Sequence, residues 1–334
     1  MNVVSRSRPQ DLRFTSEVER ATSHLYDKVK KVIPEVEWPT YAPLIARINQ
    51  LKAQRNAVIL GHNYMTPDIF HTVADIRGDS LALAQQGART EARVIVMAGV
   101  HFMAESADIL TSDRQKVILP DLAAGCSMAD MATAQQVADA WKVFEEIGIA
   151  TSTIPVTYMN SSAAIKSFTG FNGGTVCTSS NAERAMRWAF EKGERVFFLP
   201  DQHLGRNTAV LKLGLTLDDC VVWNPWKPRG GLTDAELRSA KVILWRGHCS
   251  VHGRFSVDNV KEIRARIPNV SVLVHPECQH DVVKSADVVG STEMIIRTVS
   301  EAPAGSSWAV GTELNLVKRL AAKNPDKEVV FLDK

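Results

Sequence analysis

Two of the five cysteines stand in matching surroundings, each a few residues after a short apolar run. Lys116-Val-Ile-Leu119 leads to Cys126, and Lys241-Val-Ile-Leu244 leads to Cys249. A parallel strand that ends near a cysteine presents the thiol at the carboxyl edge of a sheet, where open α/β sheets bind ligands. Thiolates on such loops are ligands for an iron–sulfur cluster. The alternative is a buried structural cysteine, which is the commoner role of a lone thiol.

A third copy of the apolar run, Lys327-Glu-Val-Val-Phe-Leu332, stands close to the end of the sequence. In the first repeat, Cys126 stands 64 residues after His62. If His275 is the equivalent of His62, the same separation places the corresponding cysteine about five residues past the last residue. We therefore expect three thiolates, one from each of three repeats, of which this sequence contains two. Three thiolates leave one iron of a [4Fe–4S] cluster open to substrate, because four are needed to saturate it.

The remaining cysteines occupy other positions in their repeats, and we interpret them as non-ligands: Cys177, Cys220 and Cys278. An odd number of widely spaced cysteines, with no export signal at the N-terminus, argues against a disulfide framework. A close CxxC pair is absent as well, which disfavours a zinc site.

The composition is typical of a globular enzyme. Hydrophobic residues make up 45% and charged residues 23% of the 334 residues, which suffices for two or three domains. The formal net charge is +2, so the chain lacks the basic field that nucleic-acid binding requires. No stretch approaches the roughly 18 apolar residues of a membrane span. We therefore expect a cytoplasmic enzyme with neither nucleic acid nor membrane as a partner.

Short apolar runs alternate with helical segments along most of the chain. We expect strands at 56–60, 94–97, 116–119, 154–157, 175–177, 195–199, 241–244, 270–274, 286–289, 308–310 and 327–332. Such continuous runs are typical of parallel sheets covered by helices on both faces. Because the alternation restarts twice, we predict three homologous three-layer α/β domains around a pseudo-threefold axis, with the active site at the centre.

The expected domain boundaries follow these restarts. An N-terminal extension is expected over residues 1–38, repeat one over 39–126, repeat two over 127–249, and repeat three over 250–334, without its C-terminal segment. Repeat two contains an insertion at 207–240, for which the sequence indicates no role.

Hydroxyl-bearing turns precede three of the expected helices, at residues 79–80, 178–180 and 290–292. Hydroxyls and free backbone N–H groups at a helix N-terminus can bind carboxylates or phosphate. The alternative is a plain helix cap, but three turns after corresponding strands favour anion binding.

Candidate proton-transfer groups follow other strands. His62 and His275 occupy equivalent places in repeats one and three, and Tyr64 and Glu277 stand two residues after them. Such side chains transfer protons when they lie within hydrogen-bond reach of a substrate. Lys166 could form a Schiff base, although a solvated helix lysine is the commoner case.

An ordered series of motifs runs from about Leu44 to the end: Gly61-His-Asn-Tyr64, Gly78-Asp-Ser80, Gly99-Val-His-Phe-Met-Ala-Glu105, Tyr158-Met-Asn160, Cys177-Thr-Ser-Ser-Asn181, Pro200-Asp-Gln-His-Leu-Gly205, Cys249-Ser-Val-His252, Val274-His-Pro-Glu277 and Gly290-Ser-Thr292. In these motifs the chain resembles the quinolinate synthase family, the A protein of bacterial NAD biosynthesis, and this resemblance carries several expectations. It implies three α/β domains around a pseudo-threefold axis. It also implies a transferase that condenses iminoaspartate with dihydroxyacetone phosphate to quinolinate, phosphate and water.

The resemblance further implies a [4Fe–4S] cluster on three cysteines. Cys126 and Cys249 match two of the ligands, and the third lies in a C-terminal segment that this sequence does not contain. The matching catalytic positions are Tyr64, His275 and Glu277. The matching substrate-binding positions are His62, Ser80, Tyr158, Met159, Asn160, Ser179, His275, Pro276, Glu277, Ser291 and Thr292. An aspartate oxidase or dehydrogenase that supplies iminoaspartate is the expected functional partner.

Two other functions are compatible with the residues alone. One is an iron–sulfur hydro-lyase, in which an open iron dehydrates a hydroxy acid without any triose phosphate. The other is a non-catalytic protein that binds dicarboxylates or phosphate, with buried inert cysteines.

Overall fold

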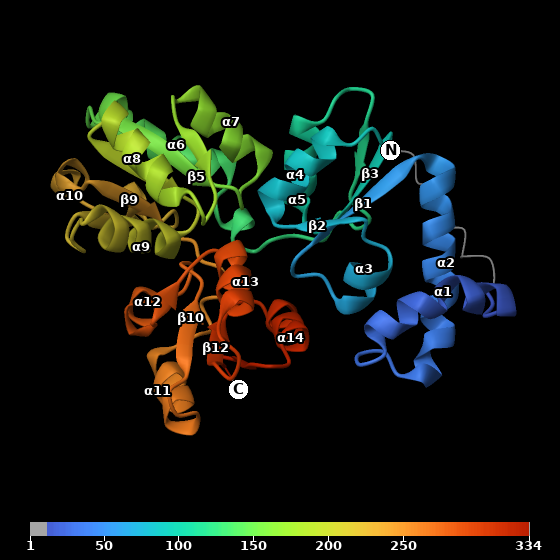
Figure 1. Ribbon diagram of the computed structural model, residues 1–334. Coiled ribbons are helices and arrows are strands. Elements are labelled where there is room, and N and C mark those ends of the chain that lie inside the picture. The colour runs from blue at the N-terminus through green and yellow to red at the C-terminus, as the bar shows by residue number, and fades with distance from the viewer. Residues whose placement is uncertain (1–11, 334) are drawn as a thin grey trace. The chain divides into compact units, whose positions relative to one another are not determined.

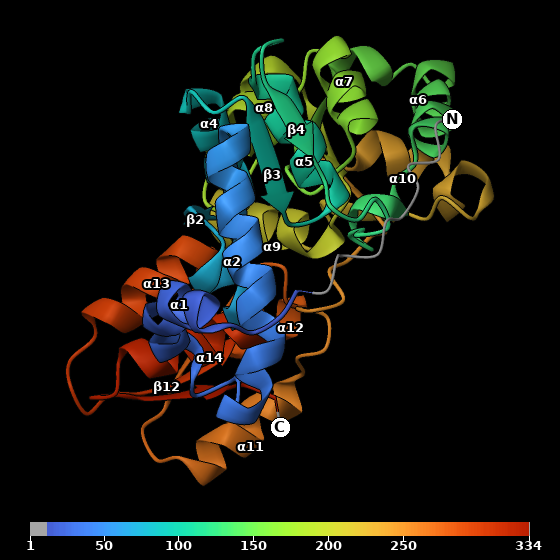
Figure 2. The same ribbon diagram turned by 90° about the vertical axis from the view of Figure 1, so that its right-hand side faces the viewer.

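The computed structural model describes residues 12–333, and these form an α/β protein (Figures 1 and 2). The chain divides into two compact units. The first consists mainly of residues up to Pro120, and the second mainly of residues from Asp121 onward, together with the short segments 79–81 and 100–106. Among the described residues, no helix has both the length and the apolar character needed to cross a membrane.

The first unit contains one parallel four-stranded sheet in the order β2-β1-β3-β4. Its strands are β1 (Ala57–His62), β2 (Ile76–Gly78), β3 (Val94–Ala98) and β4 (Lys116–Ile118). Its helices are α1 (Ser16–Val29), α2 (Trp38–Arg55), α3 (Pro67–Thr72), α4 (Ser80–Arg89) and α5 (His101–Leu110), the last two in part grouped with the second unit.

Helix α1 falls within the segment that we expected to be an N-terminal extension, of which residues 1–11 lie outside the described residues. The helix begins after Thr15, whose hydroxyl accepts a hydrogen bond from the backbone N–H of Val18 at 3.3 Å. It packs beside α2, and both views show the two helices together (Figures 1 and 2). Leu25 and Val29 of α1 join a buried cluster with Ile59 of β1, so this segment stabilises the core of the first unit.

The second unit contains two further parallel sheets, in the orders β6-β5-β7-β9-β8 and β11-β10-β12-β13. The five-stranded sheet consists of β5 (Thr153–Tyr158), β6 (Thr175–Cys177), β7 (Arg195–Leu199), β8 (Cys220–Trp223) and β9 (Val242–Trp245). The four-stranded sheet consists of β10 (Ser271–Val274), β11 (Val288–Val289), β12 (Ser307–Gly311) and β13 (Glu328–Phe331).

Nine α-helices cover these two sheets. They are α6 (Ala134–Glu146), α7 (Ala163–Phe171), α8 (Ala182–Lys192), α9 (Gln202–Leu213), α10 (Asp234–Ser239), α11 (Val257–Arg266), α12 (His280–Ser285), α13 (Thr292–Glu301) and α14 (Leu314–Lys323), counted within the described residues of this unit. Figure 1 shows α12 on one side of the β10–β12 pair and α13 and α14 on the other, which is the expected three-layer arrangement.

The three sheets share one strand order, in which the first strand of each lies between the second and the third. The first and third sheets also share a detail: the Asp75 carboxylate accepts from the Ile59 N–H at 2.9 Å, and Asp287 accepts from Val272 at 2.7 Å. The middle sheet differs by the added β8, which comes from the segment 207–240. The predicted α/β class with parallel sheets is thus confirmed, whereas the pseudo-threefold axis stays a prediction.

All the expected strands are present, with ends shifted by one or two residues, and two strands were not expected. The strand β2 is three residues long and carries the charged Arg77 at its centre, so its apolar signal is too weak to recognise. The strand β8 lies in the segment that we interpreted as an insertion. Its position at the edge of the middle sheet, beside β9, explains the longer repeat two.

An aromatic cluster fills one side of the middle sheet. The ring of Phe144 on α6 meets Phe197 edge to face at a centroid distance of 5.0 Å, and Trp223 at 5.4 Å. Trp245 at the end of β9 is fully buried and joins the same cluster. Its indole N–H donates to the backbone carbonyl of Met131 at 2.7 Å, which ties the end of β9 to the loop that follows Cys126.

Gly174, directly before β6, allows two chain segments to approach more closely than a residue with a side chain would permit. A Cβ at this position would lie 1.9 Å from the backbone carbonyl oxygen of Pro155 on β5. We predict that Gly174→Ala lowers the free energy of unfolding by about 1–3 kcal/mol, because overpacking forces the backbone to shift. Gly170→Ala is the control, since a Cβ there meets nothing within 4 Å. Urea denaturation followed by circular dichroism measures both, and equal midpoints would contradict the prediction.

Candidate active site

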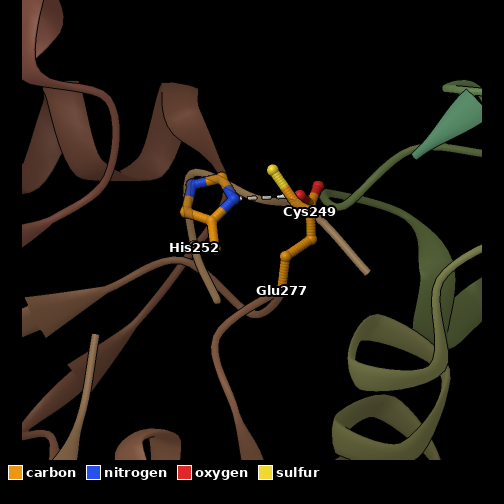
Figure 3. Close-up of side chains that lie close together, drawn as sticks. All are labelled: Cys249, His252 and Glu277. Atoms are coloured by element: carbon orange, nitrogen blue, oxygen red, sulfur yellow. Dashed lines mark hydrogen bonds and ion pairs between the residues drawn. The ribbon is translucent and has the colours of Figure 1, made fainter. Parts of the chain in front are cut away.

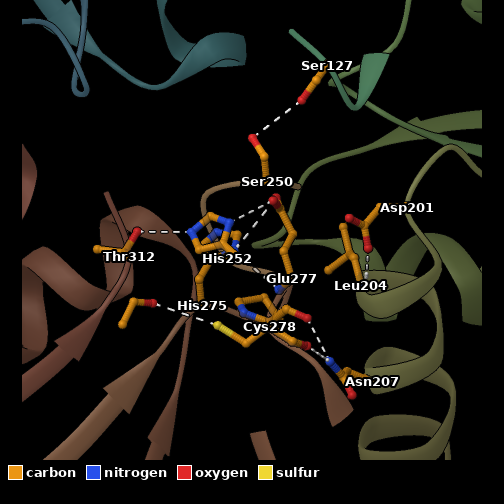
Figure 4. Close-up of polar contacts among 12 residues, drawn as sticks. Ser127, Asp201, Leu204, Asn207, Ser250, His252, His275, Glu277, Cys278 and Thr312 are labelled. Atoms are coloured by element: carbon orange, nitrogen blue, oxygen red, sulfur yellow. Dashed lines mark hydrogen bonds and ion pairs between the residues drawn. The ribbon is translucent and has the colours of Figure 1, made fainter. Parts of the chain in front are cut away.

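A buried carboxylate, Glu277, lies at the centre of a polar network in the second unit (Figure 4). It stands two residues after His275, in the loop that follows β10. Both residues are 2% exposed. The Glu277 N–H donates to Nδ1 of His275 at 3.3 Å, so Nδ1 carries no proton and the neutral ring presents an Nε2–H donor.

His252 connects this carboxylate to the neighbouring strand. Its Nδ1 lies 2.9 Å from Oε2 of Glu277, and its Nε2 lies 3.2 Å from the hydroxyl of Thr312, directly after β12. The His252 ring stacks on His275 with a centroid distance of 4.3 Å and an interplanar angle of 14°. We did not select His252 or Thr312 from the sequence as site residues. The Cys249-x-x-His252 spacing directly after a strand is the sequence pattern that could have indicated His252 as a site residue.

The charge of Glu277 is set by these neighbours. Burial raises the pKa of this carboxyl, but the imidazoles of His275 and His252 and a hydrogen bond from Tyr158 outweigh burial and lower the pKa to about 2. Burial lowers the pKa of His275 to about 3, and His252 adds to this effect. At neutral pH the loop therefore holds an ionised carboxylate beside a neutral imidazole.

A second buried carboxyl, Asp201, lies near Glu277 at the N-terminus of α9. Its Oδ1 accepts from the Leu204 N–H at 2.7 Å, and its backbone bridges to Gly247, two residues before Cys249. Burial raises the pKa of Asp201 well above its ordinary value, and the charge of Glu277 adds to this effect. The two buried carboxyls therefore oppose each other's ionisation: the charge of Glu277 favours the protonated form of Asp201.

The loops that carry Cys126 and Cys249 meet in the second unit. The hydroxyls of the next residues, Ser127 and Ser250, lie 3.4 Å apart (Figure 4). Burial raises the pKa of both thiols, and the charge of Glu277 raises each further. The loops of the two cysteines with matching context therefore lie side by side, whereas Cys177 and Cys278 are buried, in a strand and in a loop. That Cys177, Cys220 and Cys278 are not ligands stays a prediction.

The paired loops fit an iron–sulfur cluster chemically. Two thiol-bearing loops meet at Ser127 and Ser250, and backbone N–H groups of Val251 and His252 oppose the effect of burial on the pKa of the Cys249 thiol. Cys249 also forms a group with His252 and Glu277 in which one ligand atom from each residue lies within 4.8 Å of the others (Figure 3). Each of these residue types is a metal ligand.

Two of the expected anion-binding turns face one cavity of about 440 Å³ in the second unit. Ser179 lines it before α8, and Ser291 lines it at the N-cap of α13, where its hydroxyl accepts from the Met294 N–H at 3.4 Å. Thr292 is buried at the first position of the same helix. Pro276 lines the cavity as well, which connects it to the loop of Glu277.

Tyr158 is the last residue of β5, and Met159 and Asn160 follow the strand directly. Tyr158 is 7% exposed and its side chain hydrogen-bonds to Glu277. Met159 is buried, and its N–H donates to the carbonyl of Cys177 at 2.7 Å, which continues the pairing of β5 with β6. The structure therefore joins Tyr158 directly to the Glu277 network.

His62 and Tyr64 belong to the first unit. His62 is the last residue of β1, and Tyr64 stands in the loop that follows. The Tyr64 N–H donates to Nδ1 of His62 at 3.2 Å, as the N–H of Glu277 does to His275. The two rings meet edge to face with a centroid distance of 4.7 Å. Ser80 is the first residue of α4. The common turn supports the sequence equivalence of His62 and His275.

Lys166 on α7 is not the solvated helix lysine that we took to be the commoner case. Its ammonium donates to the backbone carbonyl of Ser161 and lies 5.4 Å from the ring centroid of Phe102. Burial lowers the pKa of this amine to about 8, although the charge of Glu105 opposes the change. The structure gives no contact between Lys166 and Glu277.

We predict that Lys166 reacts with an amine-acylating reagent along a pH profile centred near 8, because half of the amine is neutral there. The same lysine in the urea-unfolded chain should require a pH about two units higher. Labelling at a series of pH values, followed by peptide mass spectrometry, gives both profiles. Superimposable profiles in the folded and unfolded chains would refute the prediction.

The fold and the site define a class: an α/β enzyme with parallel sheets, whose polar and thiol side chains gather where strands end. Known sequences identify the family. The model of the family described as "Quinolinate synthetase A protein" matches residues 46–334. The chain therefore belongs to the quinolinate synthase family, whose members are enzymes of NAD biosynthesis.

Individual relatives agree with the family match. A quinolinate synthase of Streptomyces coelicolor is 64% identical over 301 residues, which cover 89% of this chain and 76% of the relative. A quinolinate synthase of a Nocardioides species is 64% identical over 283 residues, covering 83% and 72%. A third, of a Geobacillus species, is 51% identical over 290 residues, covering 86% and 78%.

Proposed function

We propose that the chain is the transferase that condenses iminoaspartate with dihydroxyacetone phosphate to give quinolinate, phosphate and water. The observation that carries the proposal is the buried, ionised Glu277, bonded to His252 and Tyr158 and close to both cysteine loops. The family match supplies the reaction class. A hydro-lyase would form its product without triose phosphate, so dependence of product formation on that substrate separates the two reactions.

Binding is assigned to the donors at helix N-termini and strand ends. The hydroxyls of Ser179, Ser291 and Thr292, at the N-termini of α8 and α13, hold the substrate carboxylates. The Nε2–H of His275 donates to a substrate oxygen, because its Nδ1 is already occupied as an acceptor. His62, Ser80, Met159, Asn160 and Pro276 complete the proposed set of substrate contacts. Burial of the site excludes water from two unstable reactants.

Proton transfer is assigned to Glu277 and Tyr64. The Glu277 carboxylate is ionised, so it can accept a proton from the substrate carbon or nitrogen that becomes nucleophilic. The hydrogen bonds from His252 and Tyr158 keep the carboxylate in one orientation. Tyr64 is the second proton donor and acceptor. The triose phosphate loses phosphate and is attacked by iminoaspartate, and ring closure and dehydration follow.

Cys126 and Cys249 are the proposed ligands of a [4Fe–4S] cluster, together with the third cysteine that the family places in its C-terminal segment. When bound, a cluster with one open iron supplies a Lewis acid for dehydration. The serines after the two cysteines, Ser127 and Ser250, hold the loops together. An aspartate-oxidising enzyme is the proposed functional partner, since iminoaspartate has to be supplied.

We expect Glu277→Gln to lower kcat by about 10²–10⁴-fold, because the amide cannot accept the proton. The absorption spectrum of the cluster should be unchanged, since Glu277 is not among its proposed ligands. Quinolinate formation by the anaerobically purified enzyme measures kcat. Glu236→Gln, in the exposed first turn of α10, is the matched control. A wild-type kcat in the Glu277 variant would remove this residue from the proposed chemistry.

We expect Cys126→Ser and Cys249→Ser each to lose the cluster, because serine does not replace a thiolate on iron. Cys278→Ser should keep it, since that thiol is buried and its Sγ lies 3.9 Å from the carbonyl of Gly311. Iron and sulfide content after anaerobic reconstitution of the full chain gives the answer. Full iron content in the Cys126 or Cys249 variant would contradict the assignment.

A further inference from the structure

Cys249, His252 and Glu277 form a three-ligand group that the cluster assignment leaves unexplained (Figure 3). One ligand atom from each residue lies within 4.8 Å of the other two. Cys249 and His252 share one tight turn, closed by the hydrogen bond from the Gly253 N–H to the Cys249 carbonyl at 2.8 Å. Glu277 reaches the same point from the loop after β10. Cys126 is not part of this group.

The three donor types are those of a catalytic zinc site. Thiolate, imidazole and carboxylate all bind Zn²⁺ at about 2.0–2.3 Å, and three protein ligands with one open position is the usual arrangement. Tetrahedral coordination at those bond lengths separates the ligand atoms by about 3.3–3.8 Å. Oε2 of Glu277 and Nδ1 of His252 are 2.9 Å apart, and the whole group lies within 4.8 Å. Movements of well under 2 Å therefore bring the three atoms to one cation.

The surroundings of His252 match those of a metal-bound histidine. Such a ring usually donates its second N–H to an oxygen that fixes its tautomer. Nε2 of His252 lies 3.2 Å from the Thr312 hydroxyl, while Nδ1 faces Glu277. The stacked ring of His275 restricts rotation on the other side. On metal binding the ring proton moves from Nδ1 to Nε2, where the Thr312 oxygen accepts it.

The charge of the group favours a divalent cation. Glu277 is 2% exposed, and among the ion pairs of residues 12–333 its only partners are histidines. A buried carboxylate without a permanent cation is costly. A thiolate and a carboxylate together neutralise one divalent cation, and binding releases the proton of the Cys249 thiol to solvent.

We propose that the cluster-free chain binds one zinc-type divalent cation through Cys249, His252 and Glu277, with Thr312 as the positioning residue of His252. The site shares only Cys249 with the proposed cluster. One cation at this site therefore excludes the cluster, and the proposal does not rest on the condensation reaction.

Cobalt is a suitable probe, because thiolate-bound Co²⁺ in a tetrahedral site absorbs strongly. The cluster is removed from the reduced full chain by chelation, and Co²⁺ is titrated anaerobically. We expect one cobalt per chain, a sulfur-to-cobalt charge-transfer band, and displacement of Co²⁺ by Zn²⁺. Cys249→Ser should lose the band, and His252→Gln and Glu277→Gln should weaken binding. Thr312→Val should weaken binding about 10–100-fold and leave the band in place.

The controls separate this site from the cluster. Cys126→Ser should keep full cobalt affinity, although the same variant is expected to lose the cluster. Cys220→Ser and His280→Gln, which change a similar thiol and imidazole elsewhere in the second unit, should bind cobalt as the parent does. Cobalt binding that requires Cys126, or that is unchanged in both His252→Gln and Thr312→Val, would overturn the proposal. Circular dichroism checks folding, and Thr312→Val retains all three ligands if another variant fails to fold.

Discussion

The second unit is organised around one buried negative charge. Removing the Glu277 carboxylate from water costs several kcal/mol, so its neighbours have to compensate for the lost hydration. They do so without lysine or arginine: His252 and Tyr158 donate to the carboxylate, and burial raises the pKa of the nearby Asp201. Because no permanent cation is paired with it, this carboxylate can coordinate an incoming cation or face a proton that a substrate gives up.

Parallel sheets explain how these groups meet. Tyr158 ends β5 of the middle sheet, while Glu277 follows β10 and Thr312 follows β12 of the last sheet. In every βα unit the polar residues stand at the carboxyl end of the strand, so each sheet offers its functional side chains along one edge. The buried strands need only be apolar, and the loops are free to carry chemistry. Cys249 occupies such a loop after β9.

Much of this arrangement could be predicted from residue types and spacing. The strands were recognised by their apolar runs, and Cys126, Cys249, His275 and Glu277 by their places after those strands. The partners His252 and Thr312 were not recognised. In the sequence His252 is 25 residues from Glu277 and 60 residues from Thr312, and contacts between residues so far apart depend on how the loops fold. The helix α1 was missed for a similar reason, since its polar composition conceals the two or three apolar residues that bury it against α2.

Cys249 lies between the loop of Cys126 and the pair His252 and Glu277, and this position affects which metal centre it can join. On one side, its loop touches the loop of Cys126 through Ser250 and Ser127; on the other, its thiol faces His252 and Glu277. A thiolate next to a buried carboxylate is unfavourable, so without a cation this cysteine stays protonated. Any metal that enters must displace that proton and gains the attraction of the Glu277 charge. The carboxylate that is suited to proton transfer thus also determines which metal centre can form beside it, because a cation that bonds directly to Glu277 takes away the base.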